Sequence, residues 1–314
     1  MAGKKVSIAN FNLVFHEKGL DKGMLEYFDE IVMPALTCGY FRKSGDATFL
    51  FMDIKVFERY GEYILTGIIV KKTILEVKSD LTSDGRLIEV DEKYPAAPYS
   101  TFIIYLKNHR MVYVENQKGS PNIKSFRATM QYILNKYVKQ QMFELEEEER
   151  EKYPIPILNV VGIPTREKLK AVLKDAEKIN KLTLRFYPLN GDLDTIGMLN
   201  GFSTELRQLV DSKNGDIILK SPKNVDGVIE LVEKSEGTVE PILQVTFPGK
   251  RKVTINNDNM SERMEIDIRG DNLQEELDNM IMNTRDIQSL QYTSKGNQSI
   301  YDKSKSKIIK FIKK

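Results

Sequence analysis

Three ionisable residues have the types and spacing that metal-dependent nucleases use. Asp53 lies two residues before Lys55, and Glu76 lies two residues before Lys78, in segments whose apolar residues alternate. Side chains two positions apart on a strand point to the same face, so each acid would lie beside a lysine. Such a set can hold Mg²⁺ and activate a water molecule. Asp53, Glu76 and Lys78 are therefore candidate catalytic residues, although alternating acids and bases are also common on the solvent face of an antiparallel sheet.

Other catalytic patterns are missing from the sequence. The two histidines, His16 and His109, are too far apart for a local metal-ligand motif, and the single cysteine, Cys38, excludes an internal disulfide and a cysteine-built zinc site. The chain has no glycine-rich phosphate loop of the P-loop or dinucleotide type, and no GxSxG turn for a nucleophilic serine. We therefore expect no metal and no cofactor, and the pattern favours a non-enzymatic function.

Basic side chains gather at three places in the sequence. The first is a helix predicted over 165–180, on which lysines four residues apart would form one row. The second is a turn near residue 251, and the third is the polar tip of a predicted hairpin. The candidate phosphate contacts at these places are Lys170, Lys174 and Lys178, then Arg251 and Lys252, then Lys107, His109 and Arg110. Each phosphate that Lys or Arg neutralises releases counterions and adds affinity that does not depend on base sequence.

The composition is that of a folded protein with balanced charge. Of 314 residues, 41% are hydrophobic and 29% charged, and 47 Lys+Arg against 45 Asp+Glu give a net charge of +2. This balance excludes a wholly disordered or collagen-like chain, but a near-neutral total can conceal a basic face. No apolar run approaches the roughly 18 residues that span a bilayer. We expect a cytoplasmic protein with no membrane insertion.

The elements that must position these side chains indicate an α+β fold with two domains. Residues 1–152 are predicted to form an antiparallel β-rich domain, with strands over 48–57, 63–77, 100–106 and 111–115, closed by a long helix after Ser120-Pro121. An acidic run that ends in two prolines, Pro154 and Pro156, indicates a boundary near residue 152.

The rest of the chain alternates element types. Residues 153–290 are predicted to form a mixed α/β sandwich, in which 238–247, 252–255 and 264–268 make an antiparallel meander. Residues 291–314 are predicted to be a basic tail that follows a flexible linker. Its apolar residues would need a cover, which favours a homodimer; they are Ile308, Ile309, Phe311 and Ile312.

Three stretches carry a resemblance to a known family: Gly67–Lys72 (GIIVKK), Phe102–Val114 (FIIYLKNHRMVYV) and Leu182–Asn190 (LTLRFYPLN). They resemble an uncharacterised bacterial family in which a glycine-basic strand precedes a hairpin with a His-Arg or His-Lys tip. The layout is similar, more distantly, to the phage exclusion protein RexA and to the DNA-binding subunit of the Kiwa anti-phage system. The resemblance implies a two-domain, dimeric, cytoplasmic DNA-binding protein of phage defence, and it implies no catalytic residue.

Three hypotheses follow from the sequence. The leading one is a non-enzymatic, largely sequence-independent DNA-binding protein of a bacterial anti-phage (phage exclusion) system that contacts the phosphate backbone. One alternative is a metal-dependent nuclease that uses Asp53, Glu76 and Lys78. The other is a sensor whose N-terminal sheet recognises a phage protein or a second protein of the defence system.

Overall fold

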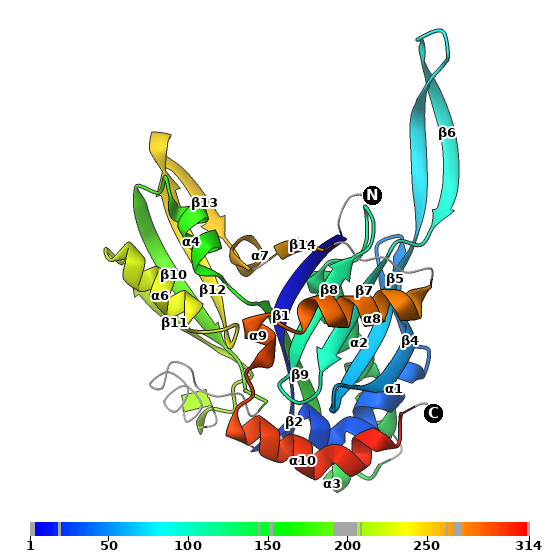
Figure 1. The fold of residues 1–314 in the computed structure, drawn as a ribbon, viewed down its shortest axis with the longest axis vertical. Coiled ribbons are helices and arrows are strands. Elements are labelled where there is room, and N and C mark those ends of the chain that lie inside the picture. The colour runs from blue at the N-terminus through cyan, green and yellow to red at the C-terminus, as the bar shows by residue number, and fades with distance from the viewer. Residues whose placement is uncertain are drawn as a thin grey trace.

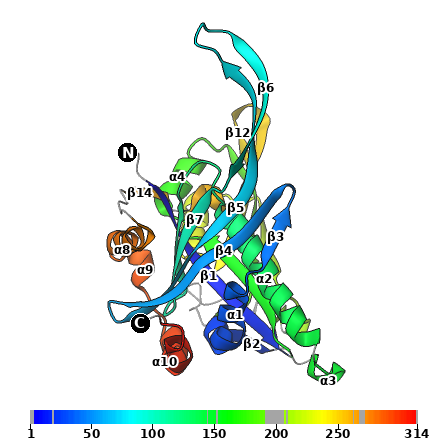
Figure 2. The same ribbon diagram turned by 90° about the vertical axis from the view of Figure 1, so that its right-hand side faces the viewer.

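Two antiparallel sheets carry the fold. The computed structural model describes residues 4–17, 20–143, 145–150, 153–190, 206–207, 209–261, 263–266 and 272–312. Within these residues the first sheet has ten strands and the second has four. Helices pack against both sheets (Figure 1; Figure 2). The α+β fold class predicted from the sequence is therefore confirmed.

The first sheet is built around the long strand β1, which pairs with β2, β8, β9 and β14. The main path through the sheet runs β14-β1-β8-β7-β5-β4-β3. Its strands are β1 (Lys4–Glu17), β2 (Leu20–Gly23), β3 (Phe41–Ser44), β4 (Ala47–Arg59), β5 (Glu62–Leu81), β6 (Leu87–Ala96), β7 (Tyr99–Tyr105), β8 (Arg110–Glu115), β9 (Ile155–Gly162) and β14 (Arg263–Ile266).

Helices cover both faces of this sheet. The long helix α2 begins one residue after Asn122, whose side-chain oxygen accepts a hydrogen bond from the Ser125 backbone N–H at 2.9 Å. The ring of Phe126 on α2 packs at 5.0 Å from that of Phe102 on β7. Leu277 on α8 packs in a second apolar cluster on the opposite face of the sheet. The helical segments around the sheet are η1 (Met24–Tyr27), η2 (Phe28–Val32), α1 (Met33–Thr37), α2 (Ile123–Phe143), α3 (Glu147–Arg150), α8 (Leu273–Thr284) and α9 (Gln288–Gln291).

The change from the first sheet to the second does not fall at the predicted boundary near residue 152. β9 lies beyond that point and pairs with β1 over eight positions, from Ala9↔Gly162 to His16↔Ile155. β14, predicted as the third strand of a meander, also pairs with β1 instead of β13. Both strands return to the first sheet because β1 is long enough to offer them partners at its two ends.

The second sheet has the order β11-β10-β12-β13, and every neighbouring pair is antiparallel. The lobe predicted to be a mixed α/β sandwich thus has an antiparallel sheet among its described strands. Helices α4 and α6 cover one face, where Leu169 and Val232 pack with Leu243 of β12. The elements of this lobe are α4 (Arg166–Leu173), β10 (Lys178–Phe186), β11 (Gly215–Lys220), α6 (Val225–Glu233), β12 (Val239–Phe247), η3 (Pro248–Lys250), β13 (Arg251–Ile255) and α7 (Asn257–Met260).

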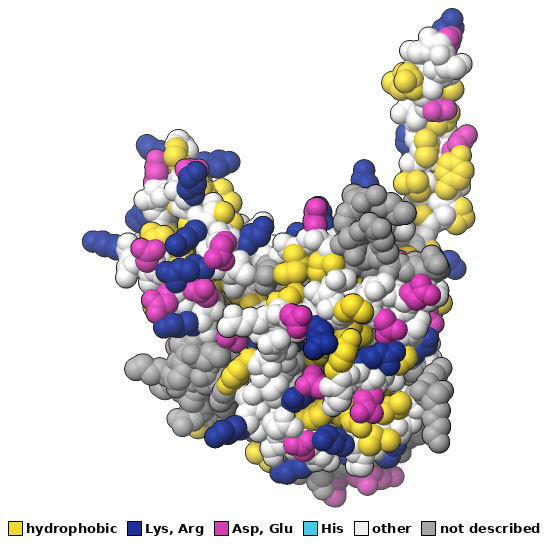
Figure 3. Space-filling view, viewed as in Figure 1, with side chains coloured by type: hydrophobic (Ala, Val, Ile, Leu, Met, Phe, Trp, Pro, Cys, Tyr) yellow, Lys and Arg dark blue, Asp and Glu magenta, His cyan; other side chains and the backbone are white. Residues whose placement is uncertain are grey.

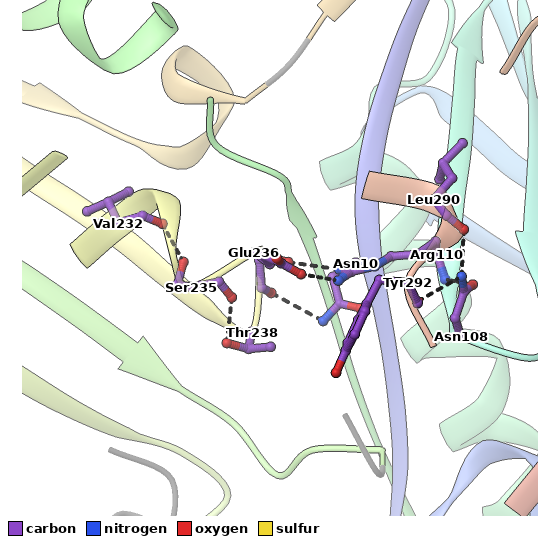
Figure 4. Close-up of polar contacts among 10 residues, drawn as sticks. Asn10, Asn108, Arg110, Val232, Ser235, Glu236, Thr238, Leu290 and Tyr292 are labelled. Atoms are coloured by element: carbon purple, nitrogen blue, oxygen red, sulfur yellow. Dashed lines mark hydrogen bonds and ion pairs between the residues drawn. The ribbon is translucent and has the colours of Figure 1, made fainter. Parts of the chain in front are cut away.

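Buried polar contacts join the two sheets (Figure 4). Arg110, at the start of β8, donates to the backbone oxygen of Glu236 at 2.8 Å and forms an ion pair with its carboxylate at 2.9 Å. Asn108, in the same turn, donates to the backbone oxygen of Leu290 at 2.6 Å. The turn between β7 and β8 is therefore held by the segment before β12 and by the segment after α8.

Replacing Arg110 with Met should lower the free energy of unfolding by about 1.5–3 kcal/mol, because hydrogen bonds from a buried charged donor are lost. The matched control is Arg59→Met, whose ion pair with Asp278 is on the surface and should contribute under about 1 kcal/mol. Urea unfolding of both variants measures the difference. Equal losses would show that the Arg110 contacts do not hold the two sheets together.

The C-terminal segment is a docked helix, so the prediction of a flexible linker and basic tail is wrong. Helix α10 (Lys295–Ile309) is capped by Ser294, whose side chain accepts from the Asn297 backbone N–H. The Tyr63 backbone N–H donates to the Tyr301 hydroxyl at 2.9 Å, and Lys310 forms an ion pair with Asp29 at 2.6 Å. Three of the four apolar residues that were expected to need a partner chain are covered within the chain. Ile308 lies in the core of the first sheet, Phe311 and Ile312 are partly buried against that core, and Ile309 is 50% exposed.

Candidate nucleic-acid interface

The structure does not bring the three candidate catalytic residues together. Asp53 lies at a bulge of β4, where the register with β5 shifts between Met52↔Ile68 and Lys55↔Thr66. Glu76 lies eight residues beyond Ile68 along β5, which is roughly 26 Å at the rise of a strand. A single metal ion cannot be held by carboxylates so far apart.

Glu76 and Lys78 instead belong to a ladder of surface ion pairs. Lys78 lies 2.6 Å from Asp91 and 3.4 Å from Glu76, which also pairs with Lys93 at 3.4 Å. Hydrogen bonds from Lys78 and Lys93 lower the pKa of the exposed Glu76 carboxyl. In the part of the chain that the structure describes, no group of three His, Cys, Asp or Glu residues could hold a metal ion. The nuclease alternative thus loses the site on which it depended.

The predicted hairpin tip is present, but it is buried. His109 is 0% exposed and Arg110 is 5% exposed. Lys107, which is partly exposed, is neutralised by Glu62 at 2.7 Å. The segment between α6 and β12 and the segment after α8 cover this tip, so the prediction that His109 and Arg110 contact phosphates is wrong. For Lys107 the contact stays a prediction.

The predicted lysine row on a helix is split between two faces of the second sheet. Helix α4 ends at Leu173, so Lys170 lies within it, Lys174 lies at its C-cap, and Lys178 begins β10. Arg251 stacks over the ring of Phe247 at 5.3 Å, and Phe247 packs with the core beneath the helices. Lys170, Lys174 and Arg251 therefore belong to the helix-covered side, whereas Lys178 and Lys252 do not.

Strand register places four lysines together on the face of the second sheet that α4 and α6 leave uncovered. Lys181 is opposite Lys220 of β11 and opposite Gln244 of β12. Two residues further along β12, in the next row on the same face, Thr246 is opposite Lys178 on one side and Lys252 on the other. Register partners share a face, and Leu182, next to Lys181, packs in the core under the helices. We name this set the outer-face lysine cluster: Lys178, Lys181, Lys220 and Lys252.

The outer face is polarised from one end to the other. Beyond the lysines, Thr183 is opposite Ile218 and Ile242, which gives a short apolar row. The next row contains Arg185 between Asp216 and Glu240, and Arg185 bonds Asp216 at 2.8 and 3.1 Å. Hydrogen bonding to Asp216 raises the pKa of Arg185 further above its usual range. The acids of this face are therefore at the end away from the lysines.

The other acid of that row is also engaged. Arg127 of α2 approaches Glu240 at 3.8 Å, and the Tyr187 hydroxyl donates to Glu240 at 3.0 Å. Among the described residues, none of the four cluster lysines has an ion pair within 4.0 Å. Their charges are thus available to an anionic ligand.

The surface view agrees with a basic second lobe that also carries acids. Lys and Arg side chains gather over the lobe of β10–β13, with Asp and Glu side chains among them (Figure 3). Basic and acidic side chains are thus interspersed on the side of this lobe that Figure 3 shows.

Comparisons with known proteins do not identify a family. No protein-family model and no curated protein matches this chain. The resemblance to phage-exclusion proteins therefore stays a prediction. Within the described segments, no helix has the length and apolar character needed to cross a membrane.

Proposed function

We propose that the chain is a non-enzymatic protein that binds duplex DNA through its phosphate backbone, largely without regard to base sequence. The observation that carries this proposal is the convergence of four lysines, which have no ion pair with any described residue, on the sheet face that α4 and α6 leave uncovered. The setting in bacterial phage defence rests on the resemblance of Gly67–Lys72 and the hairpin after it.

The chemistry of the cluster favours backbone contact over base reading. Its cations are lysines, which bind phosphate as point charges and lack the planar fork by which arginine reads guanine. Lys220 on β11 and Lys252 on β13 are separated by three strand spacings across the sheet, about 14 Å, and by one row along it. The separation across the strands is close to the roughly 12 Å width of the major groove. The cluster can therefore reach phosphates on both sides of a groove.

Binding to two unrelated duplexes of equal length tests the proposal. We expect dissociation constants within about twofold of each other at about 50 mM salt, because counterion release does not depend on sequence. Fluorescence anisotropy with labelled duplexes measures both constants, and a single strand of the same length serves as comparison. Undetectable duplex binding at low salt, or a strong preference for one duplex, would contradict the proposal.

A further inference from the structure

A two-stranded arm stands away from the body of the protein. β4 pairs with β5 as far as Lys72, and β7 pairs with it as far as Val70. From Thr73 onwards the only described partner of β5 is β6, and the two strands project from the first sheet (Figure 1; Figure 2). Residues 73–96 are named the arm. A two-stranded ribbon with unpaired edges is only marginally stable in water, so a further contact would stabilise it.

One face of the arm carries an apolar pair at each end, with Val77 opposite Glu92 and Ser79 opposite Glu89 between them. Leu75 is opposite Tyr94, and Leu81 is opposite Leu87 at the tip. Leu81 is 66% exposed and Leu87 is 74% exposed. Figure 3 shows hydrophobic side chains along the arm. Apolar side chains gathered on a projecting surface indicate a contact with another molecule.

The tip of the arm is acidic as well as apolar. Glu89 lies on the same face as the two leucines, and Asp80, opposite Ile88, lies on the other face of the tip; neither acid has an ion pair within 4.0 Å among the described residues. The whole arm has more acids than bases, namely Glu76, Asp80, Asp84, Glu89, Asp91 and Glu92 against Lys78, Arg86 and Lys93. A surface that receives the tip must therefore combine apolar and basic groups.

A groove of that composition lies at the base of the same arm. It has a volume of about 740 Å³ and lies between the β3–β4 hairpin and the start of the arm. Phe41, Leu50 and Ile74 give it an apolar lining, and two lysines accompany them, Lys43 and Lys72. Neither lysine has an ion pair within 4.0 Å in the described parts of the chain. One acid, Asp46, also lines the groove.

We propose that two copies of the chain form a two-fold dimer in which the tip of each arm docks into the groove at the base of the other arm. A two-fold axis makes the arms antiparallel, so each tip meets the partner's base and both contacts form at once. Nine residues of β5 lie in the arm and span roughly 30 Å, which sets the length over which the arms lie side by side. Leu81 and Leu87 meet the apolar lining, and Asp80 and Glu89 meet Lys43 and Lys72.

A charge exchange between two full-length variants tests this dimer. One variant, Lys43→Glu with Lys72→Glu, has an acidic groove; the other, Asp80→Lys with Glu89→Lys, has a basic tip. In a dimer of the first variant, acidic tips meet acidic grooves, and in a dimer of the second, basic tips meet basic grooves. We therefore expect each variant alone to be a monomer in sedimentation equilibrium. Mixed together they place opposite charges in both contacts, so we expect heterodimers. Failure of the mixture to associate would overturn the proposal.

The apolar part of the contact has its own test. Leu81→Ser with Leu87→Ser should raise the dissociation constant of the dimer at least about 100-fold, because four leucines, two in each of the two contacts, lose their burial. The matched control is Met282→Ser with Ile309→Ser, which changes two exposed apolar residues away from the arm. This control should leave the dissociation constant of the dimer unchanged. Circular dichroism checks that all variants are folded. A monomeric wild-type chain, or a dimer whose dissociation constant the tip substitutions do not raise, would overturn the proposal. Neither result would contradict the proposed DNA binding, which a monomer can also perform.

Discussion

Changing Lys178, Lys220 and Lys252 together to Glu is expected to weaken duplex binding about 100-fold at low salt. Each substitution removes one phosphate contact and adds a charge that repels the backbone, so the loss should be similar for every DNA sequence. The three residues are exposed and make no ion pair among the described residues. Their replacement should therefore leave the melting temperature almost unchanged.

The matched control changes the net charge equally at other places. Lys118→Glu, Lys295→Glu and Lys303→Glu alter three exposed lysines outside the second lobe. We expect this control to weaken binding by no more than about threefold, because it acts only through the long-range field of the protein. If both triple variants lose affinity to the same extent, the second sheet is not the binding surface.

Replacing Ile308 with Ala is expected to lower the free energy of unfolding by about 2–5 kcal/mol, because the substitution leaves a cavity in the core. Ile308 is 0% exposed and packs in the main core of the first sheet, although it belongs to the last helix of the chain. The next residue, Ile309, is 50% exposed and gives an internal control. Ile309→Ala should cost under about 1 kcal/mol.

Urea unfolding measures the stability of both variants, and the dependence of the unfolding free energy on urea concentration should be the same for each. Equal small losses would show that α10 contributes little to the core and that the segment behaves as the tail predicted from its composition. A large loss for Ile308→Ala alone would show that this basic segment is structural, and that its lysines are held near the surface of the first sheet by the helix.

Local patterns in the sequence predict many of the elements. Alternating apolar residues predict strands over 48–57 and 100–106; the first lies within β4 (47–59) and the second differs from β7 (99–105) by one residue at each end. The apolar stripe after Ser120-Pro121 predicts the long helix, which the structure shows as α2. In each case the apolar periodicity of one segment is sufficient to predict the element, because the apolar face of that strand or helix must be buried.

Pairing between distant segments could not be predicted in the same way. The helix predicted over 165–180 ends near residue 173 because the following residues pair with β12 as β10. Tertiary pairing thus overrides the helical spacing of Lys170, Lys174 and Lys178. Lys220 joins the cluster only because β11 pairs with β10. The two strands are far apart in the sequence, so no local pattern predicts that Lys220 lies opposite Lys181.

Burial of the hairpin tip has the same cause. A polar turn such as Lys107-Asn108-His109-Arg110 normally faces water. Here Glu236 and Leu290, more than a hundred residues further along the chain, bond Arg110 and Asn108. Residue types in one turn carry no information about segments that fold over it later.

The salt dependence of duplex binding tests the central claim most directly. Affinity should fall linearly with the logarithm of salt concentration, with a slope of about −0.9 for each phosphate that is neutralised. The wild-type slope should therefore exceed that of the Lys178→Glu, Lys220→Glu, Lys252→Glu variant by about 2.7 in magnitude. Equal slopes for the two proteins would show that these lysines do not touch the backbone.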